Sequence, residues 1–220
     1  MTPRRFARLT SILDRRQTTL TVLLDDLQKA HNVSAVMRTC DAVGVGWIHA
    51  LSTEDSFRAK TTSAAGSEHY VETELHRDAQ TAVDALRGRG FRLYAAHLDD
   101  RAIDFRSVDF TRPTCLVMGQ EGPGVSAELL DRVDGTIAIP MVGAVASLNV
   151  SVATAVILYE AQRQRQLAGL YDTPHVDPET RHRRLFEWGY RDIARFCRER
   201  GYAYPELGDA GEIIGEVPRG

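Results

Sequence analysis

The sequence has few of the features that mark secreted, membrane-embedded or disulfide-stapled proteins. Only three cysteines occur among its 220 residues, Cys40, Cys115 and Cys197, and they lie far apart. Their odd number and wide spacing argue against a disulfide framework and a cysteine zinc site, and favour reduced thiols. No apolar run reaches the roughly 20 residues of a membrane-spanning helix, and the N-terminal residues lack the apolar segment of a signal peptide. We therefore expect a cytoplasmic protein without a membrane partner.

Several motifs of nucleotide-binding and hydrolytic enzymes are also missing. The sequence contains neither the phosphate-loop pattern Gly-x4-Gly-Lys-Ser/Thr nor the nucleophile-elbow pattern Gly-x-Ser-x-Gly. Gly44-Val-Gly46 follows a predicted helix rather than a strand, which argues against a Rossmann dinucleotide site. His69 and His76 lack a credible set of metal-ligating neighbours in the sequence, so no metal is expected.

Positive charge is confined largely to the two ends of the chain. Residues 1–19 hold five arginines and one aspartate, and residues 161–200 hold nine arginines and six acids, whereas residues 20–160 are strongly acidic. The chain as a whole carries a net charge of −3, and only two of its 27 basic residues are lysine. Because the planar guanidinium matches phosphate, this segregation favours a polyanionic partner. The alternative is two solvated helical faces.

Hydrophobic periodicity predicts strands alternating with helices. Such alternation indicates an α/β domain with a mostly parallel sheet, helices on both faces, and ligand sites at the carboxyl ends of the strands. The helix beginning near residue 147 is apolar almost all round over 150–161, which predicts burial. Strands are expected over 19–27, 47–51, 91–98, 114–118 and 136–139, helices over 3–16, 32–43, 78–89, 126–132 and from 147 onward, and a polar loop over 52–67.

Composition divides the chain into three parts. We expect a basic N-terminal helix over 1–19, a central α/β domain over 20–168 and a basic C-terminal extension over 169–220. Within the extension, 177–200 is typical of a basic helical segment, and 201–220 is expected to be loose.

Three segments of the central domain contain residues suited to a site. Ser147 and Asn149 precede the apolar helix, where free backbone N–H groups suit an anion or developing negative charge, or where the two side chains merely cap the helix. The loop Gly119–Gly124 lets a ligand approach the backbone and offers the Glu121 carboxylate, or is an ordinary turn. Arg38 lies in an otherwise apolar helical stretch, or is a surface arginine at its edge.

Taken together, these segments resemble a known family. Asn32-Val-Ser-Ala-Val-Met-Arg38, Leu116-Val-Met-Gly-Gln-Glu-Gly122 and Ile139-Pro-Met…Ser147-Leu-Asn-Val-Ser-Val-Ala153 are similar, in order and spacing, to the three motifs of the SpoU branch of the SPOUT RNA methyltransferases. The flanking segments Arg4-Arg-Phe-Ala-Arg8 and Glu160-Ala-Gln-Arg-Gln-Arg-Gln resemble those of TrmH-type tRNA (guanosine-2′-O)-methyltransferases. Gly122-Pro-Gly departs from the bulkier residues common in relatives.

The resemblance implies a SPOUT-type α/β fold with a C-terminal trefoil knot, working as a homodimer. It implies S-adenosyl-L-methionine as cofactor and tRNA, rather than DNA, as partner, with methylation of the ribose 2′-oxygen of the D-loop guanosine at tRNA position 18. Two alternatives stay open: the same chemistry on ribosomal RNA, and a non-catalytic RNA-binding protein that kept the fold.

The resemblance also implies residue roles. Asn32, Ser147, Asn149 and Glu121 would shape the catalytic pocket, and Arg38 would act either as the base or as a permanently charged orienting group, because a guanidinium keeps its proton at ordinary pH. The cofactor would be held by backbone atoms of His97, Leu98, Gly119, Ile139 and Leu148. RNA contacts are expected from Arg4, Arg8, Arg15, Arg16, His31, Arg163 and Arg165.

Overall fold

The computed structural model describes residues 1–53, 57 and 69–216, and these form two compact units. The larger unit is Gln17–Leu170; the smaller combines Met1–Arg16 with Tyr171–Gly220. The two ends of the chain, which sequence analysis treats as separate extensions, thus belong to one unit. Most of the polar loop expected over 52–67 lies outside the described residues. Within the described part of the chain, no helix is long and apolar enough to cross a membrane.

The larger unit is built on a seven-stranded sheet in the order β3-β2-β1-β6-β4-β7-β5, in which every strand pair is parallel. The expected mostly parallel α/β sheet is confirmed, and the knot stays a prediction. The strands are β1 (Leu20–Asp25), β2 (Trp47–Leu51), β3 (Glu72–His76), β4 (Arg92–Ala96), β5 (Ile103–Asp104), β6 (Thr114–Met118) and β7 (Gly135–Ala138).

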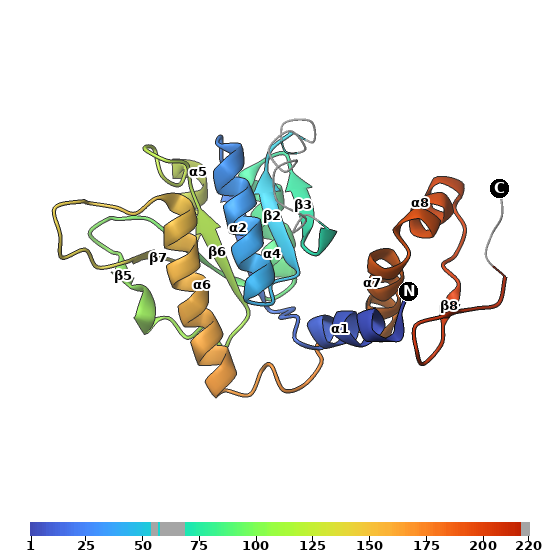
Figure 1. The fold of residues 1–220 in the computed structure, drawn as a ribbon. Helices are drawn as coiled ribbons and strands as arrows, with labels where there is room; N and C mark the ends of the chain where they lie inside the picture. The colour runs from blue at the N-terminus through green and yellow to red at the C-terminus, as the bar shows by residue number, and fades with distance from the viewer. Residues whose placement is uncertain (54–56, 58–68, 217–220) are drawn as a thin grey trace. The chain divides into compact units, whose positions relative to one another are not determined.

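Helices cover both faces of this sheet, as predicted. Helices α2 (Ala30–Ala42) and α6 (Val150–Leu167) pack side by side on one face (Figure 1). Helices α4 (Ala79–Gly88) and α5 (Ala127–Leu130) contribute to the core on the other face. Because successive side chains along a strand point to opposite faces, alternate residues of β1 belong to the two hydrophobic cores. Val22 and Leu24 pack with α2 and α6, and Leu23 packs with α4.

Two strands escaped prediction because their sequences lack the usual signal. Strand β3, Glu-Thr-Glu-Leu-His, lies at one edge of the sheet and is half exposed, so it carries polar residues where a central strand would be apolar. Strand β5 is only two residues long, at the opposite edge. The predicted central strands and the helices that follow them were found within a few residues of the expected bounds.

The prediction that α6 is buried all round is wrong. Thr154, Ile157, Leu158 and Ala161 are buried, whereas the opposite face exposes apolar side chains. Helix packing explains this: α2 and the sheet cover one side of α6, and no described residue of the larger unit covers the other. The exposed apolar residues of α6 are Val152, Val156 and Tyr159, the last 52% exposed, and Leu167 at the end of the helix.

Arg165, near the end of α6, is fully buried, contrary to its predicted role as an RNA contact. Its Nε donates to the carbonyl oxygen of Phe110 at 2.8 Å, and its Nη2 donates to the carbonyl oxygens of Thr19 at 2.7 Å and Arg112 at 3.1 Å. Its Nη1 donates to Gln17 Oε1 at 3.1 Å and Thr19 Oγ1 at 3.0 Å. With every guanidinium nitrogen engaged inside the protein, Arg165 is a structural residue.

The smaller unit contains α1 (Pro3–Asp14), α7 (Pro178–Gly189), α8 (Arg191–Arg200) and an antiparallel pair, β8 (Glu206–Leu207) with β9 (Ile213–Ile214). Two expectations are corrected here. The helical segment breaks at Tyr190, and the tail contains the β8–β9 pair.

Aromatic packing explains why the tail is ordered. The Phe186 ring stacks on Tyr204 with centroids 4.9 Å apart, and Tyr190 Oη donates to the Gly211 carbonyl at 2.8 Å. Arg16, expected to contact RNA, is buried in this unit with its guanidinium 5.6 Å from the Trp188 ring, so that expectation is also corrected.

Candidate active site

A cavity of about 510 Å³ opens at the carboxyl ends of β4, β6 and β7, where an α/β sheet is expected to bind ligands. Loops after these strands and the N-terminus of α6 surround it. All five predicted cofactor residues line this cavity, together with Glu121, Ser147 and Asn149. The five are His97, Leu98, Gly119, Ile139 and Leu148.

Glycines bring the backbone of the loop after β6 close to this cavity. Gln120 and Gly124 exchange two backbone hydrogen bonds, of 2.9 and 3.0 Å, which closes a tight turn. A Cβ at Gly119 would lie 2.1 Å from the carbonyl carbon of Gly124, so only glycine fits there. Gly122 and Gly124 adopt φ values of 95° and 75°, in the left-handed region that glycine enters without strain. The Gly122-Pro-Gly departure is thus compatible with this turn.

Asn32, Glu121 and Asn149, one residue from each of the three motifs, meet beside the cavity. Asn32 Nδ2 donates to Glu121 Oε1 at 2.9 Å, and Asn149 Nδ2 donates to the same oxygen at 2.5 Å. Asn149 Nδ2 also lies 3.3 Å from Asn32 Oδ1. Two amides therefore fix one carboxylate oxygen, which ties α2, the glycine turn and the start of α6 together.

Lys29 completes this cluster, although sequence reasoning missed it. Its Nζ forms an ion pair with Glu121 Oε2, and the hydrogen bonds from Lys29 and then Asn32 lower the pKa of the Glu121 carboxyl below its ordinary value. Glu121 is consequently ionised at neutral pH. The available signal was that Lys29 is one of only two lysines in the chain and immediately precedes α2.

Asn149 serves as helix cap and site residue at once. Its Oδ1 accepts from the backbone N–H of Ser151 at 2.9 Å, which satisfies an unpaired donor in the first turn of α6. Its Nδ2 points the other way, to Glu121. Ser147 lies two residues before this cap, exposed and at the cavity wall. Asn149 can therefore both cap the helix and belong to the site.

Arg38 does not line the cavity of its own chain. It is exposed on α2, and among the residues that the structure describes it makes no hydrogen bond or ion pair. His31, seven residues earlier on the same helix, is exposed as well. Because seven residues make about two turns, both side chains share one face of α2. This arrangement places Arg38 on a surface open to another molecule.

Comparison with known families gives two matches that together cover nearly all of the chain. The profile of the SpoU rRNA Methylase family matches residues 19–159, and the profile described as SpoU, rRNA methylase, C-terminal matches residues 163–216.

Curated relatives are similar over most of their length. The chain is 47% identical over 215 residues to the tRNA (guanosine(18)-2′-O)-methyltransferase of Escherichia coli K12, covering 97% of this chain and 94% of the relative. It is 49% identical over 187 residues to the protein of the same name from Thermus thermophilus, covering 85% of this chain and 96% of the relative.

Solved structures agree with these relatives. The A. aeolicus TrmH/SpoU tRNA modifying enzyme matches with a TM-score of 0.78 and 40% identity, over 86% of this chain and 97% of that one. The SpoU methyltransferase AviRb from Streptomyces viridochromogenes, solved in complex with the cofactor AdoMet, matches with a TM-score of 0.61 and 27% identity, over 70% of this chain and 59% of that one.

Proposed function

This chain belongs to the SpoU family of RNA methyltransferases, and from that premise we propose that it methylates the ribose 2′-oxygen of guanosine 18 in tRNA, with S-adenosyl-L-methionine as donor. The observation that carries the proposal is the meeting of Asn32, Glu121 and Asn149 beside the cavity, in a chain 47% identical to a named tRNA (guanosine(18)-2′-O)-methyltransferase. Ribosomal RNA is the alternative substrate, as the family's description suggests.

The cavity suits the cofactor in size and in the character of its walls. Its volume falls in the range of small-molecule pockets, and its walls combine apolar side chains with backbone at strand ends. Backbone N–H and C=O groups near Leu98, Ile139 and Leu148 can read an adenine edge without a charged side chain. When bound, S-adenosyl-L-methionine supplies an electrophilic methyl group on a sulfonium.

The polar cluster gives the rest of the site its rigidity. The Glu121 carboxylate holds Asn32 and Asn149 at fixed positions, and Asn149 in turn fixes the start of α6 at the cavity wall. Such preorganisation is worth several kcal/mol in a transfer reaction, because the reactants lose no further freedom on the way to the transition state. We assign Arg38 the role of a charged group that orients the ribose and phosphate, since its proton is not available for exchange at ordinary pH.

The substrate assignment is tested by methyl transfer to defined RNAs. Purified protein is incubated with radiolabelled S-adenosyl-L-methionine and an unmodified tRNA transcript, and the label is mapped by nuclease digestion. We expect one methyl group on the ribose of guanosine 18. A transcript already 2′-O-methylated at that position is the matched control and should accept none. Transfer to a ribosomal RNA fragment alone would overturn the tRNA assignment.

We also propose that two copies of the chain associate through the exposed face of α6. Val152, Val156 and Tyr159 recur at helical spacing and form an apolar stripe. Val142 and Val145, in the loop that leads into α6, add further exposed apolar surface. An apolar stripe of this kind is costly in water and typical of an interface.

Replacing Val156 with glutamate is therefore expected to convert a dimer into a monomer. A charge at the centre of the stripe would have to be buried without a partner, which costs several kcal/mol. Light scattering at micromolar concentration measures the mass. Ile214→Glu, which alters an exposed apolar residue of the smaller unit, is the control and should leave the mass unchanged. A monomeric wild type would contradict the proposal.

The exposed arginines at the chain ends are proposed to bind the tRNA backbone. Arg4, Arg8 and Arg15 are exposed in the smaller unit, and His31 and Arg163 are exposed in the larger. Arg163 is already paired with Glu160 at 2.7 Å, which reduces the positive charge that it offers to phosphate.

Replacing Arg4 and Arg8 together with glutamine should weaken tRNA binding on the order of 10-fold and lower its logarithmic salt slope by about 1.5, since each phosphate contact contributes nearly one. Filter binding at several salt concentrations measures both quantities. Arg106→Gln, which removes an exposed arginine paired with Asp104, is the control. An unchanged slope in the double variant would exclude these two contacts.

A further inference from the structure

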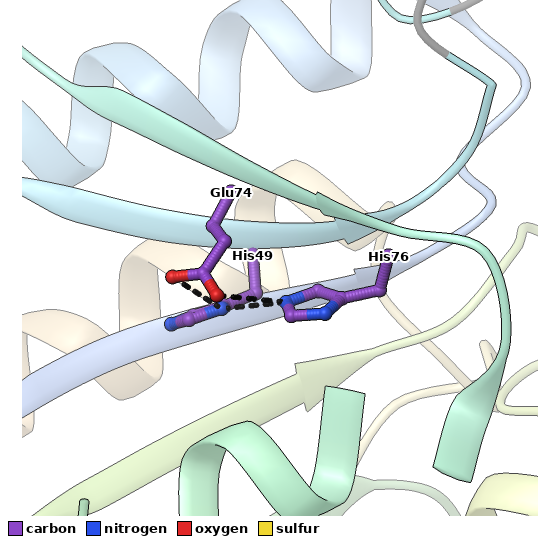
Figure 2. Close-up of side chains that lie close together, drawn as sticks. All are labelled: His49, Glu74 and His76. Atoms are coloured by element: carbon purple, nitrogen blue, oxygen red, sulfur yellow. Dashed lines mark hydrogen bonds and ion pairs between the residues drawn. The ribbon is translucent and has the colours of Figure 1, made fainter. Parts of the chain in front are cut away.

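A second group of ionisable side chains lies at the β2–β3 edge of the sheet, away from the cavity. His49 is in β2, and Glu74 and His76 are in β3. Parallel pairing puts His49 beside Glu74, and His76 follows two residues later, so all three point to one face of the sheet (Figure 2). The cavity lies instead at β4, β6 and β7, so this group has no part in the proposed methyl transfer.

The ligand atoms of these three residues converge on one point. His49 Nδ1 lies 2.9 Å from His76 Nε2, and each nitrogen lies 3.9 Å from an oxygen of Glu74. One potential ligand atom from each residue lies within 4.8 Å of the others (Figure 2). Both imidazoles are buried, and burial lowers the pKa of each ring, so both are neutral at physiological pH. Neutral imidazole is the form that ligates a metal.

We propose that His49, Glu74 and His76 bind a zinc ion. Zinc prefers a tetrahedral set of imidazole nitrogens and carboxylate oxygens at about 2.0–2.2 Å, which places its ligand atoms about 3.3 Å apart. On zinc binding the two nitrogens give up the hydrogen bond between them, and its proton moves to the other nitrogen of the same ring, so that both offer a lone pair. They also need to separate by a few tenths of an ångström, and the carboxylate needs to approach by about half an ångström. Glu74 is 40% exposed, so its side chain can make this movement, and water can fill the fourth position.

A metal at this site would link the edge strand β3 to its neighbour β2. Among the described residues, strand β3 pairs only with β2 in the sheet, and the metal would join the two strands through side chains in addition to their backbone hydrogen bonds. No metal was expected for His76 from the sequence because its partners are not its sequence neighbours: His49 is 27 residues away and reaches it only through the strand register.

Arg89, just beyond α4, competes with the metal for Glu74. Its Nη2 lies 2.8 Å from Glu74 Oε2, so metal binding must draw the carboxylate away from the guanidinium. Arg89 is half exposed and can turn to solvent. Replacing it with glutamine should therefore raise zinc affinity several-fold.

Zinc titration of the purified full-length protein against a chromophoric chelator tests the proposal. We expect one zinc per chain, and a rise in Tm of about 5 °C when free zinc reaches a hundred times its Kd. His49→Gln and His76→Gln should each weaken zinc binding by at least about 10- to 100-fold, which is the usual cost of losing a residue that only hydrogen-bonds to a metal ligand. His182→Gln is the matched control, because His182 faces a carboxylate of Glu206 at 3.7 Å without a second imidazole.

Because the buried histidine variants can fail to fold, a measurement on the wild type stands beside them. X-ray absorption of the zinc-loaded protein should show two imidazoles and oxygen ligands, and Glu74→Gln, at a half-exposed position, should bind zinc more weakly while keeping the wild-type circular dichroism. The proposal would be overturned if the protein bound less than one zinc per chain, or if the spectrum showed fewer than two imidazole ligands. Neither result bears on methyl transfer.

Discussion

Replacing Arg38 with alanine is expected to lower kcat for methyl transfer by about 100-fold or more, with little change in the affinity for S-adenosyl-L-methionine. The side chain is exposed, lies outside the cavity wall and makes no ion pair within the described residues, so its loss removes neither a cofactor contact nor a structural one. An exposed arginine with a purely structural role would cost little. A large loss confined to kcat would therefore mean that Arg38 acts on the RNA during transfer.

The lysine variant separates the two roles that an arginine can have here. Arg38→Lys keeps a positive charge but loses the planar fork that matches a phosphate or ribose, and its amine gives up a proton more easily. Near-complete loss of activity with intact cofactor binding would favour the permanently charged orienting role. Substantial activity that rises with pH would favour a true base.

Single-turnover kinetics measures the rate of methyl transfer, and calorimetry measures the affinity for S-adenosyl-L-methionine separately. Arg112→Ala is the matched control, because this arginine is likewise exposed in the larger unit and carries only a surface ion pair with Asp109. If Arg38→Ala turned over at the wild-type rate, Arg38 would have no role in methyl transfer.

The three site motifs could be located from the sequence because each occurs where local signals are strong. Gly119 directly follows an apolar strand, Asn149 caps a helix rich in apolar residues, and Asn32 lies in the first turn of another helix. Turn and cap chemistry then places all three at one end of the sheet. The two residues that prediction misplaced were basic. Arg16 and Arg165 lie in runs of arginine and glutamine that have the composition of a solvated surface, and a sequence does not record which guanidinium finds buried carbonyl partners.

Features that depend on pairing between distant segments could not be predicted from the sequence. Strand β3 has the composition of a loop, and only its pairing with β2 reveals it as a strand and brings His76 to His49. Likewise, the apolar face of α6 was predicted to be buried, yet in a single chain half of it faces outward. Hydrophobic periodicity indicates that a surface needs to be covered; it does not indicate whether the same chain covers it.

Arg165 provides the largest expected effect on stability. Replacing it with methionine keeps most of the side chain's volume but leaves the carbonyl oxygen of Phe110 without its donor. It also removes one of two donors from the carbonyl oxygens of Thr19 and Arg112, which keep hydrogen bonds from Thr114. The unsatisfied carbonyl costs about 1–3 kcal/mol, and each of the other four lost hydrogen bonds costs about 0.5–1.5 kcal/mol, partly relieved by local relaxation. We therefore expect the free energy of unfolding to fall by about 3–5 kcal/mol and Tm to fall by about 10 °C.

Urea denaturation and thermal melting measure this loss, and Arg163→Met is its matched control. Arg163 lies two residues earlier on the same helix, is exposed and is paired only with Glu160, so its replacement should change stability by about 1 kcal/mol or less. Arg165→Lys should fall between the two, because one ammonium cannot reach all the acceptors that the guanidinium spans. If Arg165→Met melted with the wild type yet bound tRNA more weakly, Arg165 would be an RNA contact after all, because only a side chain that the folded protein does not need can be removed without lowering Tm.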